Sequence, residues 1–353
     1  MKILGTRARR ERVPLRLPYR VAGRTTEAVE MFLLEVETDD RGAGLGAATP
    51  EAAITGETVE ACSEALSESS LDWLSGQDVL RLGALCQEAG RRMRSTPGAL
   101  AAVDMALHDL YARRLGVPLA DALGRVHASL PTSVTIGIQA RDEAVALAEE
   151  LVGRGFRILK VKVGEALEED TALIRRLHER FGSSVRLRAD ANVGYTPAEA
   201  VRFLEAAGDA VEFLEQPVPR ENDGLRRMPE RWRSRIAADE SLLDERDALT
   251  LAAGVPACGI FNIKLMKSGG IRPALRIAAI ADAAGIELMW GCMDESVIGI
   301  AAALHAALAC PATRYLDLDG SFDLAEDPAR GGFTVSDGEM TVTSAPGLGV
   351  DLV

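Results

Sequence analysis

Short apolar runs alternate with longer amphipathic stretches between residues 130 and 320. The runs are centred near residues 136, 160, 188, 213, 237, 262, 288 and 316, so successive centres lie 24 to 28 residues apart. A strand of about five residues, a helix of about twelve and two loops fill such an interval. The pattern therefore predicts eight strands with seven intervening helices, which indicates a parallel sheet closed into a barrel.

The stretches between the runs carry signals for helix ends. Thr196 and Pro197 supply an N-cap and a proline in the first turn. Residues 142–151 place alanine and leucine at helical spacing, and Gly153 and Gly155 end this predicted helix. No Gly-x-Gly-x-x-Gly motif opens any of the helices, so an open, doubly wound sheet is the weaker alternative.

Residues 1–128 do not follow this rhythm. Residues 29–38 form a strand-like run, and the turn at residues 39–42 with the small residues after it predicts a hairpin or meander. Helical patterns follow at residues 57–68, 78–94 and 98–115. We expect an α+β lobe over residues 1–128, and we expect the short β-like segments of residues 321–353 to pack back on it.

Composition and charge limit the possible functions. The 353 residues include 40 Lys and Arg against 53 Asp and Glu, a net charge of −13 that argues against nucleic acid as the main partner. No run of about 18 or more apolar residues is present, so we expect no membrane-spanning helix, and the first residues lack the apolar core of a signal peptide. Five cysteines without a Cys-x-x-Cys pair favour a cytoplasmic location and disfavour a thiolate zinc site.

Three carboxylates end three successive apolar runs: Asp190, Glu215 and Asp239. They lie 25 and 24 residues apart, and neighbouring strands are about 4.8 Å apart, so the three side chains should converge. A single strand-end Asp is often only a helix cap, but three like charges together are unfavourable unless a cation lies between them. Because hard oxygen ligands suit Mg²⁺ better than Zn²⁺, we predict one Mg²⁺ ion per subunit.

Lysines lie on both sides of these carboxylates in the predicted barrel. Lys160 and Lys162 are two residues apart in one run, so both point to the same face of the strand, into the barrel. Lys264 ends the sixth run, and Lys267 in the loop after it is expected to be solvated. A lysine on each side of the metal suits removal of a proton from one face of a carbon and its return on the other.

Such a site can ionise a weak carbon acid. A substrate carboxylate bound to Mg²⁺ has its developing enediolate charge neutralised, which lowers the barrier to removal of the α-proton. The lysine that acts as base must be partly neutral, and we expect crowding by the Lys160 ammonium to favour neutral Lys162. One base gives an elimination or a shift, whereas two opposed bases give inversion at carbon.

These residues and their spacing resemble the enolase superfamily, and within it the muconate-lactonizing-enzyme subgroup. The matching motifs are Lys160-Val161-Lys162, Asp190-Ala191-Asn192, Glu215-Gln216-Pro217, Asp239-Glu240-Ser241, and Lys264 followed by Ser268-Gly269-Gly270. The resemblance spans essentially the whole chain. It implies an α/β fold with a modified (β/α)7β TIM-like barrel at residues 129–320, and an α+β N-terminal capping domain at residues 1–128 that the C-terminal segment, residues 321–353, completes.

Within the subgroup, the sequence is most similar to the dipeptide epimerases. The similar motifs are Thr132-Ser133-Val134-Thr135-Ile136 in the first barrel strand, Gly291-Cys292-Met293 in the seventh-strand loop, and Asp317-Leu318-Asp319 in the eighth strand. The last motif binds the α-ammonium of the dipeptide in that family. Two carboxylates on one face of a strand end suit an ammonium, although Asp319-Gly320 is also a common turn sequence.

The reaction that the resemblance implies inverts the α-carbon of the C-terminal residue of an L,L-dipeptide. Mg²⁺ would bind the terminal carboxylate, and Lys160 is expected to bind it too. Lys162 and Lys264 would exchange the α-proton across the two faces of that carbon. Thr135 is expected to contact the substrate as well.

The preference for a side chain depends on residues around the mouth of the predicted barrel. Arg24 resembles the capping-loop arginine that binds glutamate in epimerases acting on Ala-Glu. Glu51, Asp294 and the adjacent Glu295 add carboxylates. These either favour a cationic Lys or Arg side chain, or a broad range, over Ala-Glu, or simply neutralise Arg24. Met293 is expected to complete the substrate contacts.

Other functions stay open as alternatives to a broad or cationic dipeptide epimerase. An Ala-Glu-specific epimerase is one, and a muconate-type cycloisomerase or o-succinylbenzoate synthase, which needs no ammonium receptor, is another. A Schiff-base aldolase would use Lys162 covalently, and a non-catalytic barrel would usually have lost a ligand or a base. His108 and His305 are expected to be structural, which disfavours a zinc hydrolase. We expect a dipeptide substrate, no nucleic acid, no membrane, and a homo-oligomer.

Overall fold

The computed structural model describes residues 1–21, 24–221 and 223–353, and the side chains of residues 17–25 lie outside this description. Within the described residues, eight parallel strands form one sheet in chain order. They are β5 (Val134–Ile136), β6 (Ile158–Lys162), β7 (Arg186–Asp190), β8 (Leu214–Glu215), β9 (Ile236–Ala238), β10 (Ile260–Ile263), β11 (Glu287–Gly291) and β12 (Thr313–Asp317). A parallel bridge between Thr132 and Leu316 joins the two ends of the sheet, so the predicted barrel is confirmed.

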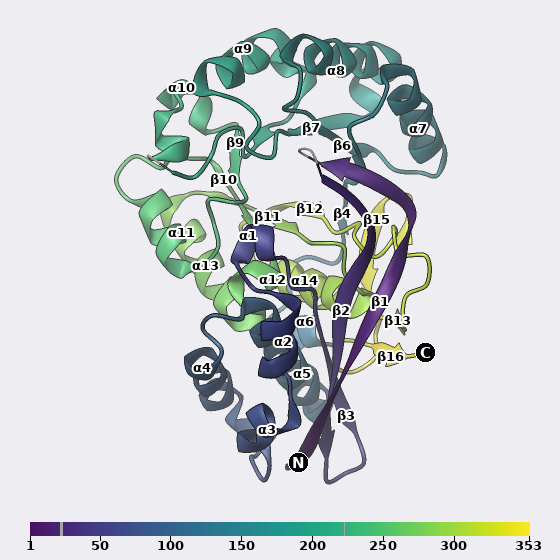
Figure 1. Cartoon of the computed structure of the whole chain (residues 1–353), viewed down its shortest axis with the longest axis vertical. Helices are drawn as coiled ribbons and strands as arrows, with labels where there is room; N and C mark the ends of the chain where they lie inside the picture. Colours follow the sequence, from purple (N-terminus) through teal and green to yellow (C-terminus); the bar gives the residue numbers. More distant parts are fainter. Residues whose placement is uncertain (22–23, 222) are drawn as a thin grey trace.

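Helices connect these strands and surround the barrel, as Figure 1 shows. They are α7 (Arg141–Gly153), α8 (Leu167–Phe181), α9 (Pro197–Ala207), α10 (Glu230–Arg233), α11 (Glu245–Ala252), α12 (Leu265–Ser268), α13 (Ile271–Ala284) and α14 (Val297–Leu308). The signals at α9 act as predicted, because Thr196 caps the helix and forms a reciprocal capping box with Glu199, with Pro197 in the first turn.

The N-terminal lobe is a three-stranded antiparallel meander covered by helices, counted within the described residues. The strands are β1 (Ile3–Val21), β2 (Arg24–Thr38) and β3 (Ala43–Ala48). The helices are α1 (Ala52–Thr55), α2 (Val59–Ala65), α3 (Glu68–Leu71), α4 (Leu82–Arg92), α5 (Pro97–Leu115) and α6 (Leu119–Leu123). The single helix predicted at residues 57–68 is two, because Ser67 caps α3 and starts a new turn.

Helix α5 joins the lobe to the barrel. Gly44 and Gly46 in β3 let the backbone of α5 approach so closely that a β-carbon at either position would collide with it. At the other face, Asp104 Oδ1 accepts hydrogen bonds from Ile271 N (2.7 Å) and Arg272 N (3.2 Å) at the start of α13. A buried carboxylate of the lobe therefore caps a barrel helix.

Buried Cys86, Asp104 and His108 gather beside this contact, which raises the question of a metal site. The His108 Nδ1 atom already hydrogen-bonds the Asp104 carbonyl oxygen at 2.7 Å and lies 3.2 Å from Asp104 Oδ1. Asp104 Oδ1 also accepts hydrogen bonds from the two backbone amides at the start of α13. The group is therefore a structural hydrogen-bond network, as expected for His108.

The C-terminal segment contacts both parts of the molecule. Its strands are β13 (Ala329–Gly331), β14 (Phe333–Ser336), β15 (Glu339–Val342) and β16 (Val350–Leu352), and β15 pairs with β4 (Leu130–Pro131) at the start of the barrel. Leu348 N also donates to buried Asp109 of α5 at 2.7 Å, and Arg16 N of β1 donates to Asp323 O at 2.7 Å. The division at residues 128 and 320 stays a prediction.

Two further expectations concern the whole chain. Among the helices of the described residues, none is both long enough and apolar enough to cross a bilayer. All five cysteines, each within the described part, carry free thiols.

Candidate active site

The three predicted metal ligands lie side by side at the carboxyl ends of adjacent strands. Asp190 is the last residue of β7 and is in register with Glu215, the last residue of β8. Glu215 is in register with Ala237 of β9, and Asp239 follows two residues later. All three are buried, with at most 2% of each residue exposed. The strand spacing in the sequence therefore brings the carboxylates together as expected.

Lys160 lies at the centre of this acidic group. Its Nζ atom is 3.0 Å from Asp190 Oδ2, 2.9 Å from Glu215 Oε2 and 2.7 Å from Asp317 Oδ2. Burial alone would lower the pKa of Lys160, but the surrounding carboxylates, Asp190 foremost, raise that pKa well above its usual value. Lys160 is thus a fixed cation, suited to binding an anionic group rather than to accepting a proton.

Lys162 and Lys264 flank the carboxylates from the two sides. Lys162 Nζ donates to Asp190 Oδ2 at 2.7 Å and to Asn192 Oδ1 at 2.9 Å, and Lys264 Nζ donates to Asp239 Oδ2 at 2.8 Å. Their strands, β6 and β10, lie two places to either side of β8 in the sheet order. Their side chains are 15% and 9% exposed, against 4% for Lys160, so both can face a small ligand at the barrel mouth.

The charges around these carboxylates fit a divalent cation. Burial and the neighbouring Asp190 raise the pKa of Glu215 to about 7, and burial and Asp239 raise the pKa of Glu240 to about 7. The buried Oε2 atom of Glu240 accepts no hydrogen bond within the described residues. Crowded oxygen donors of this kind suit Mg²⁺, which Asp190, Glu215 and Asp239 would bind.

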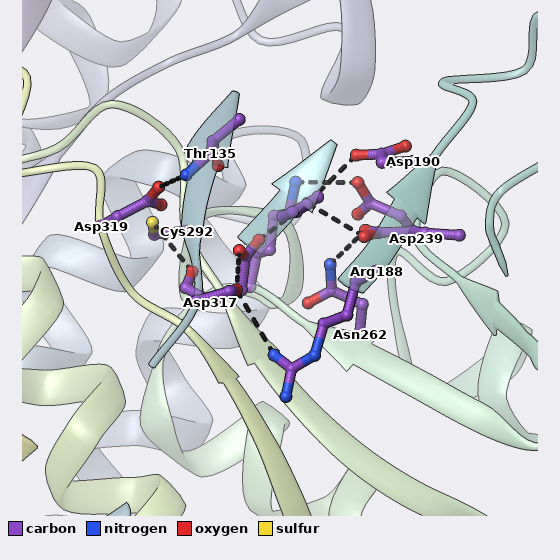
Figure 2. Close-up of polar contacts among 12 residues, drawn as sticks. Thr135, Arg188, Asp190, Asp239, Asn262, Cys292, Asp317 and Asp319 are labelled. Atoms are coloured by element: carbon purple, nitrogen blue, oxygen red, sulfur yellow. Dashed lines mark hydrogen bonds and ion pairs between the residues drawn. The ribbon is translucent and has the colours of Figure 1, made fainter. Parts of the chain in front are cut away.

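The Asp-x-Asp pair at the end of β12 faces the same site (Figure 2). Asp317 accepts hydrogen bonds from Lys160 Nζ at 2.7 Å and from Ser133 Oγ at 2.6 Å. Asp319 Oδ2 accepts one from Thr135 N at 2.8 Å, so Thr135 contributes its backbone there. Burial and Asp317 raise the pKa of Asp319 to about 7. An incoming ammonium would relieve this crowding.

Several polar residues for which no role was predicted support the three carboxylates. Asn262 Nδ2 donates to Glu215 Oε1 at 2.6 Å, and Gln216 Oε1 accepts from Asp239 N at 3.0 Å. Asn192 joins Lys162 to Glu240, whose Oε1 atom is 3.2 Å from Asn192 Nδ2. Asn192 and Gln216 each directly follow or nearly follow a strand-end acid, and this position is the sequence signal for them.

Arg188 is a further supporting residue of the site, and it was not identified from the sequence. It lies two residues before Asp190 on β7 and is fully buried, with Nη1 donating to Leu316 O at 2.8 Å and Nε to Glu212 Oε2 at 2.9 Å. Figure 2 shows its guanidinium below Asp317. Because side chains two apart share a face of a strand, this arginine inside an apolar run was a readable signal.

The expectation for Lys267 was wrong. Its Nζ atom is buried and donates to Asp239 O at 2.7 Å, to Asn262 O at 3.1 Å and to Asp239 Oδ1. The short helix α12 begins immediately after Lys264 and folds Lys267 back over the end of β9. A loop position in the sequence therefore becomes an interior position in the fold.

The residues expected around the substrate side chain are placed less completely. Glu295 is buried, accepts from Met293 N at 3.0 Å, and has its pKa raised to about 8 by burial. Glu51 caps α1 by accepting from Ala53 N at 3.2 Å, and Asp294 precedes Glu295 in the loop after β11. The side chain of Arg24 lies outside the described residues.

Comparisons with known proteins agree with this geometry. Residues 3–124 match the family described as mandelate racemase / muconate lactonizing enzyme, N-terminal domain, and residues 143–353 match the family described as enolase C-terminal domain-like. The L-Lys-D/L-Arg epimerase of Methylococcus capsulatus is 54% identical over 352 residues, which cover 99% of each chain. The L-Ala-D/L-Glu epimerase of Bacillus subtilis is 35% identical, over 99% of this chain and 97% of that one.

Solved structures extend the similarity to the fold. The crystal structure of a dipeptide epimerase from Methylococcus capsulatus with Mg and the dipeptide L-Arg-D-Lys matches with a TM-score of 0.97 and 55% identity, covering 99% of both chains.

Proposed function

Since this chain belongs to the mandelate racemase / muconate lactonizing enzyme family of the enolase superfamily, we propose that it is a Mg²⁺-dependent dipeptide epimerase. The reaction inverts the α-carbon of the C-terminal residue of an L,L-dipeptide. The observation that carries this proposal is the placement of Lys162 and Lys264, each bonded to a different strand-end carboxylate on opposite sides of β8.

Each lysine has a distinct role in the proposed reaction. When bound, Mg²⁺ supplies positive charge that stabilises the enediolate of the substrate. The Lys160 ammonium binds and orients the terminal carboxylate. One of Lys162 and Lys264 accepts the α-proton on its Nζ atom, and the ammonium of the other donates its own proton to the opposite face of the same carbon. The proton count is unchanged, and the configuration is inverted.

The Asp317–Asp319 pair distinguishes the proposed dipeptide epimerase from the cycloisomerase alternative. Both carboxylates are buried at the barrel mouth, Asp317 beside Lys160 and Asp319 on the backbone of β5. A receptor of two carboxylates recognises the α-ammonium of a dipeptide, which muconate and its relatives lack. We therefore assign Asp317 and Asp319 to the N-terminal residue of the substrate.

A cationic side chain is the preferred substrate feature in this proposal. The acidic residues expected around the substrate, Glu51, Asp294 and Glu295, favour Lys or Arg, and a relative of this chain is an L-Lys-D/L-Arg epimerase. A library of dipeptides assayed in ²H₂O tests the preference. Turnover confined to Ala-Glu would contradict the cationic preference but would still agree with the epimerase assignment.

Single lysine variants test the two-base reaction. Lys162→Ala and Lys264→Ala should each abolish epimerisation, while each still exchanges the α-proton of one diastereomer, L,L or L,D, with solvent deuterium. The two variants should retain opposite diastereomers. Exchange of the same diastereomer by both variants would contradict opposed bases. Borohydride trapping of substrate on Lys162 with EDTA-insensitive activity would instead support the aldolase alternative.

The homo-oligomer stays a prediction. The cytoplasmic location, for which the free cysteines argue, stays a prediction as well.

A further inference from the structure

Lysine is rare in this chain, and its distribution is uneven. The 40 basic residues comprise 35 arginines and only five lysines: Lys2, Lys160, Lys162, Lys264 and Lys267. Four of the five lie in the candidate site. Arginine occupies the other 35 basic positions, whereas lysine, which carries a compact ammonium, is concentrated at the site. Lys160, Lys162 and Lys264 have assigned roles in the proposed function, and Lys267 has none.

Lys267 differs from Lys264 in how its protons are used, although the two lie three residues apart. The ammonium of Lys267 has three acceptors, which are the carbonyl oxygens of Asp239 and Asn262 and the carboxylate of Asp239. An ammonium has three protons to donate, so all are occupied. Only 1% of the Lys267 side chain is exposed, against 9% for Lys264. Lys267 therefore has neither a free proton position nor a path to the substrate.

The bonds of Lys267 divide the Asp239 carboxylate between two partners. Oδ1 accepts a hydrogen bond from Lys267, while Oδ2 accepts one from Lys264 at 2.8 Å. The Asp239 main chain is fixed at its two ends as well, because Gln216 accepts from its N–H and Lys267 donates to its C=O. With its backbone and one oxygen held, the carboxylate cannot rotate.

The same ammonium reaches a second metal ligand through one residue. Lys267 donates to the carbonyl of Asn262, whose side-chain amide donates to Glu215 Oε1 at 2.6 Å. The buried network thus joins Asp239 and Glu215, which lie on adjacent strands.

We propose that Lys267 is a positioning residue for the cation: it fixes Asp239 with Oδ2 presented to the metal, and it does not exchange protons with the substrate. This inference rests on the proposed Mg²⁺ site. A purely electrostatic role would have the opposite effect on the metal, because a nearby ammonium repels Mg²⁺. Removing Lys267 therefore separates the two roles by the sign of the change in affinity.

The experiment measures Mg²⁺ binding by isothermal titration calorimetry for the wild type, Lys267→Met and the matched control Lys2→Met, which removes the exposed lysine outside the site. Loss of a residue that orients a metal ligand typically weakens binding about 10- to 100-fold, and we expect a change of this size in Lys267→Met only. Binding equal to or tighter than that of the wild type would overturn the inference. Failure of the wild type itself to bind Mg²⁺ would instead reject the proposed function.

Kinetics at saturating Mg²⁺ distinguish positioning from catalysis. Lys267→Met should regain most of the wild-type kcat as Mg²⁺ is raised, whereas Lys264→Ala should stay inactive at every concentration. A Lys267→Met activity that Mg²⁺ does not restore would overturn the positioning role. If the apolar variant does not fold, Lys267→Gln retains two donors and should show the same shift in Mg²⁺ affinity to a smaller extent.

The wild-type protein offers an independent measurement because it has so few amines. Reductive methylation followed by mass spectrometry should modify Lys2 rapidly and leave Lys267 unmodified both with and without Mg²⁺. Modification of Lys267 at a rate comparable to Lys162 would show a free, accessible amine and overturn the inference.

Discussion

Lowering the pH should destabilise the protein through His305. This residue is buried on α14, where Nδ1 accepts a hydrogen bond from Ala120 N at 2.9 Å and Nε2 lies 3.3 Å from the Leu348 carbonyl. The ring therefore carries its proton on Nε2 and is neutral. Burial lowers the pKa of His305 to about 4, because a charged ring would lose solvation and its Nδ1 acceptor.

The size of the effect follows from the two pKa values. An unfolded histidine has a pKa of about 6.5, so a folded pKa of about 4 corresponds to about 3 kcal/mol of stability. Since the folded pKa is the lower one, the unfolded chain binds the proton first. The contribution of His305 is present above pH 6.5 and is lost as pH falls toward 4. At pH 5 about 2 kcal/mol should be lost.

Urea unfolding at pH 7.5 and pH 5, for wild type and His305→Gln, measures this contribution. Glutamine keeps a donor and an acceptor but does not titrate. The loss of unfolding free energy between the two pH values should be about 2 kcal/mol smaller in the variant, and carboxylates common to both proteins cancel in the difference. The exposed His178→Gln serves as control and should behave as the wild type. Equal losses in wild type and His305→Gln would refute the reasoning.

Three other changes test the site and its support. Asp319→Asn removes a charge from the ammonium receptor and should lower kcat/KM for dipeptides about 10- to 100-fold in a steady-state epimerisation assay; unchanged kinetics would reject the receptor. Asp104→Asn weakens the cap of α13 and should cost about 1–3 kcal/mol in urea unfolding; a loss below about 0.5 kcal/mol would contradict a supporting role. Mg²⁺ at about 100 times its Kd should stabilise the fold by about 2.7 kcal/mol, measured as a thermal shift that EDTA reverses; absence of a shift would argue against the site.

The barrel was predictable because its strands are buried on both faces and recur at a nearly constant interval. Each apolar run stands out against the amphipathic helices, and a charge at the end of six of the eight runs marks the barrel mouth. Strand β1 was not predicted, since Arg7, Arg9, Arg10 and Arg12 interrupt its pattern. The physical reason is that β1 is the outer strand of its sheet, so polar side chains are tolerated along it.

The three carboxylates proposed to bind Mg²⁺ could be located from the sequence, but the contacts of Asn262 and Lys267 with them could not. Asp190, Glu215 and Asp239 share a position relative to their strands, and this position is a local property of the chain. Lys267 and Asn262 act through bonds to residues 28 and 47 positions away, namely Asp239 and Glu215. Such contacts exist only after the barrel has closed.

What a lysine does at this barrel mouth depends on how many acceptors surround it. Lys160 meets carboxylates of three residues and is held as a cation, and the ammonium of Lys267 is likewise saturated by three acceptors. Lys264 donates to one residue, Asp239, within the described residues, and 9% of its side chain is exposed, so its amine can face a substrate. Position in the barrel brings the lysines to the site, and exposure then separates Lys162 and Lys264, which can meet a substrate, from the enclosed Lys160 and Lys267. A variant with an additional hydrogen-bond acceptor beside Lys264 should slow proton transfer and leave the Mg²⁺ affinity unchanged. Loss of both proton transfer and Mg²⁺ affinity in the same variant would contradict this division.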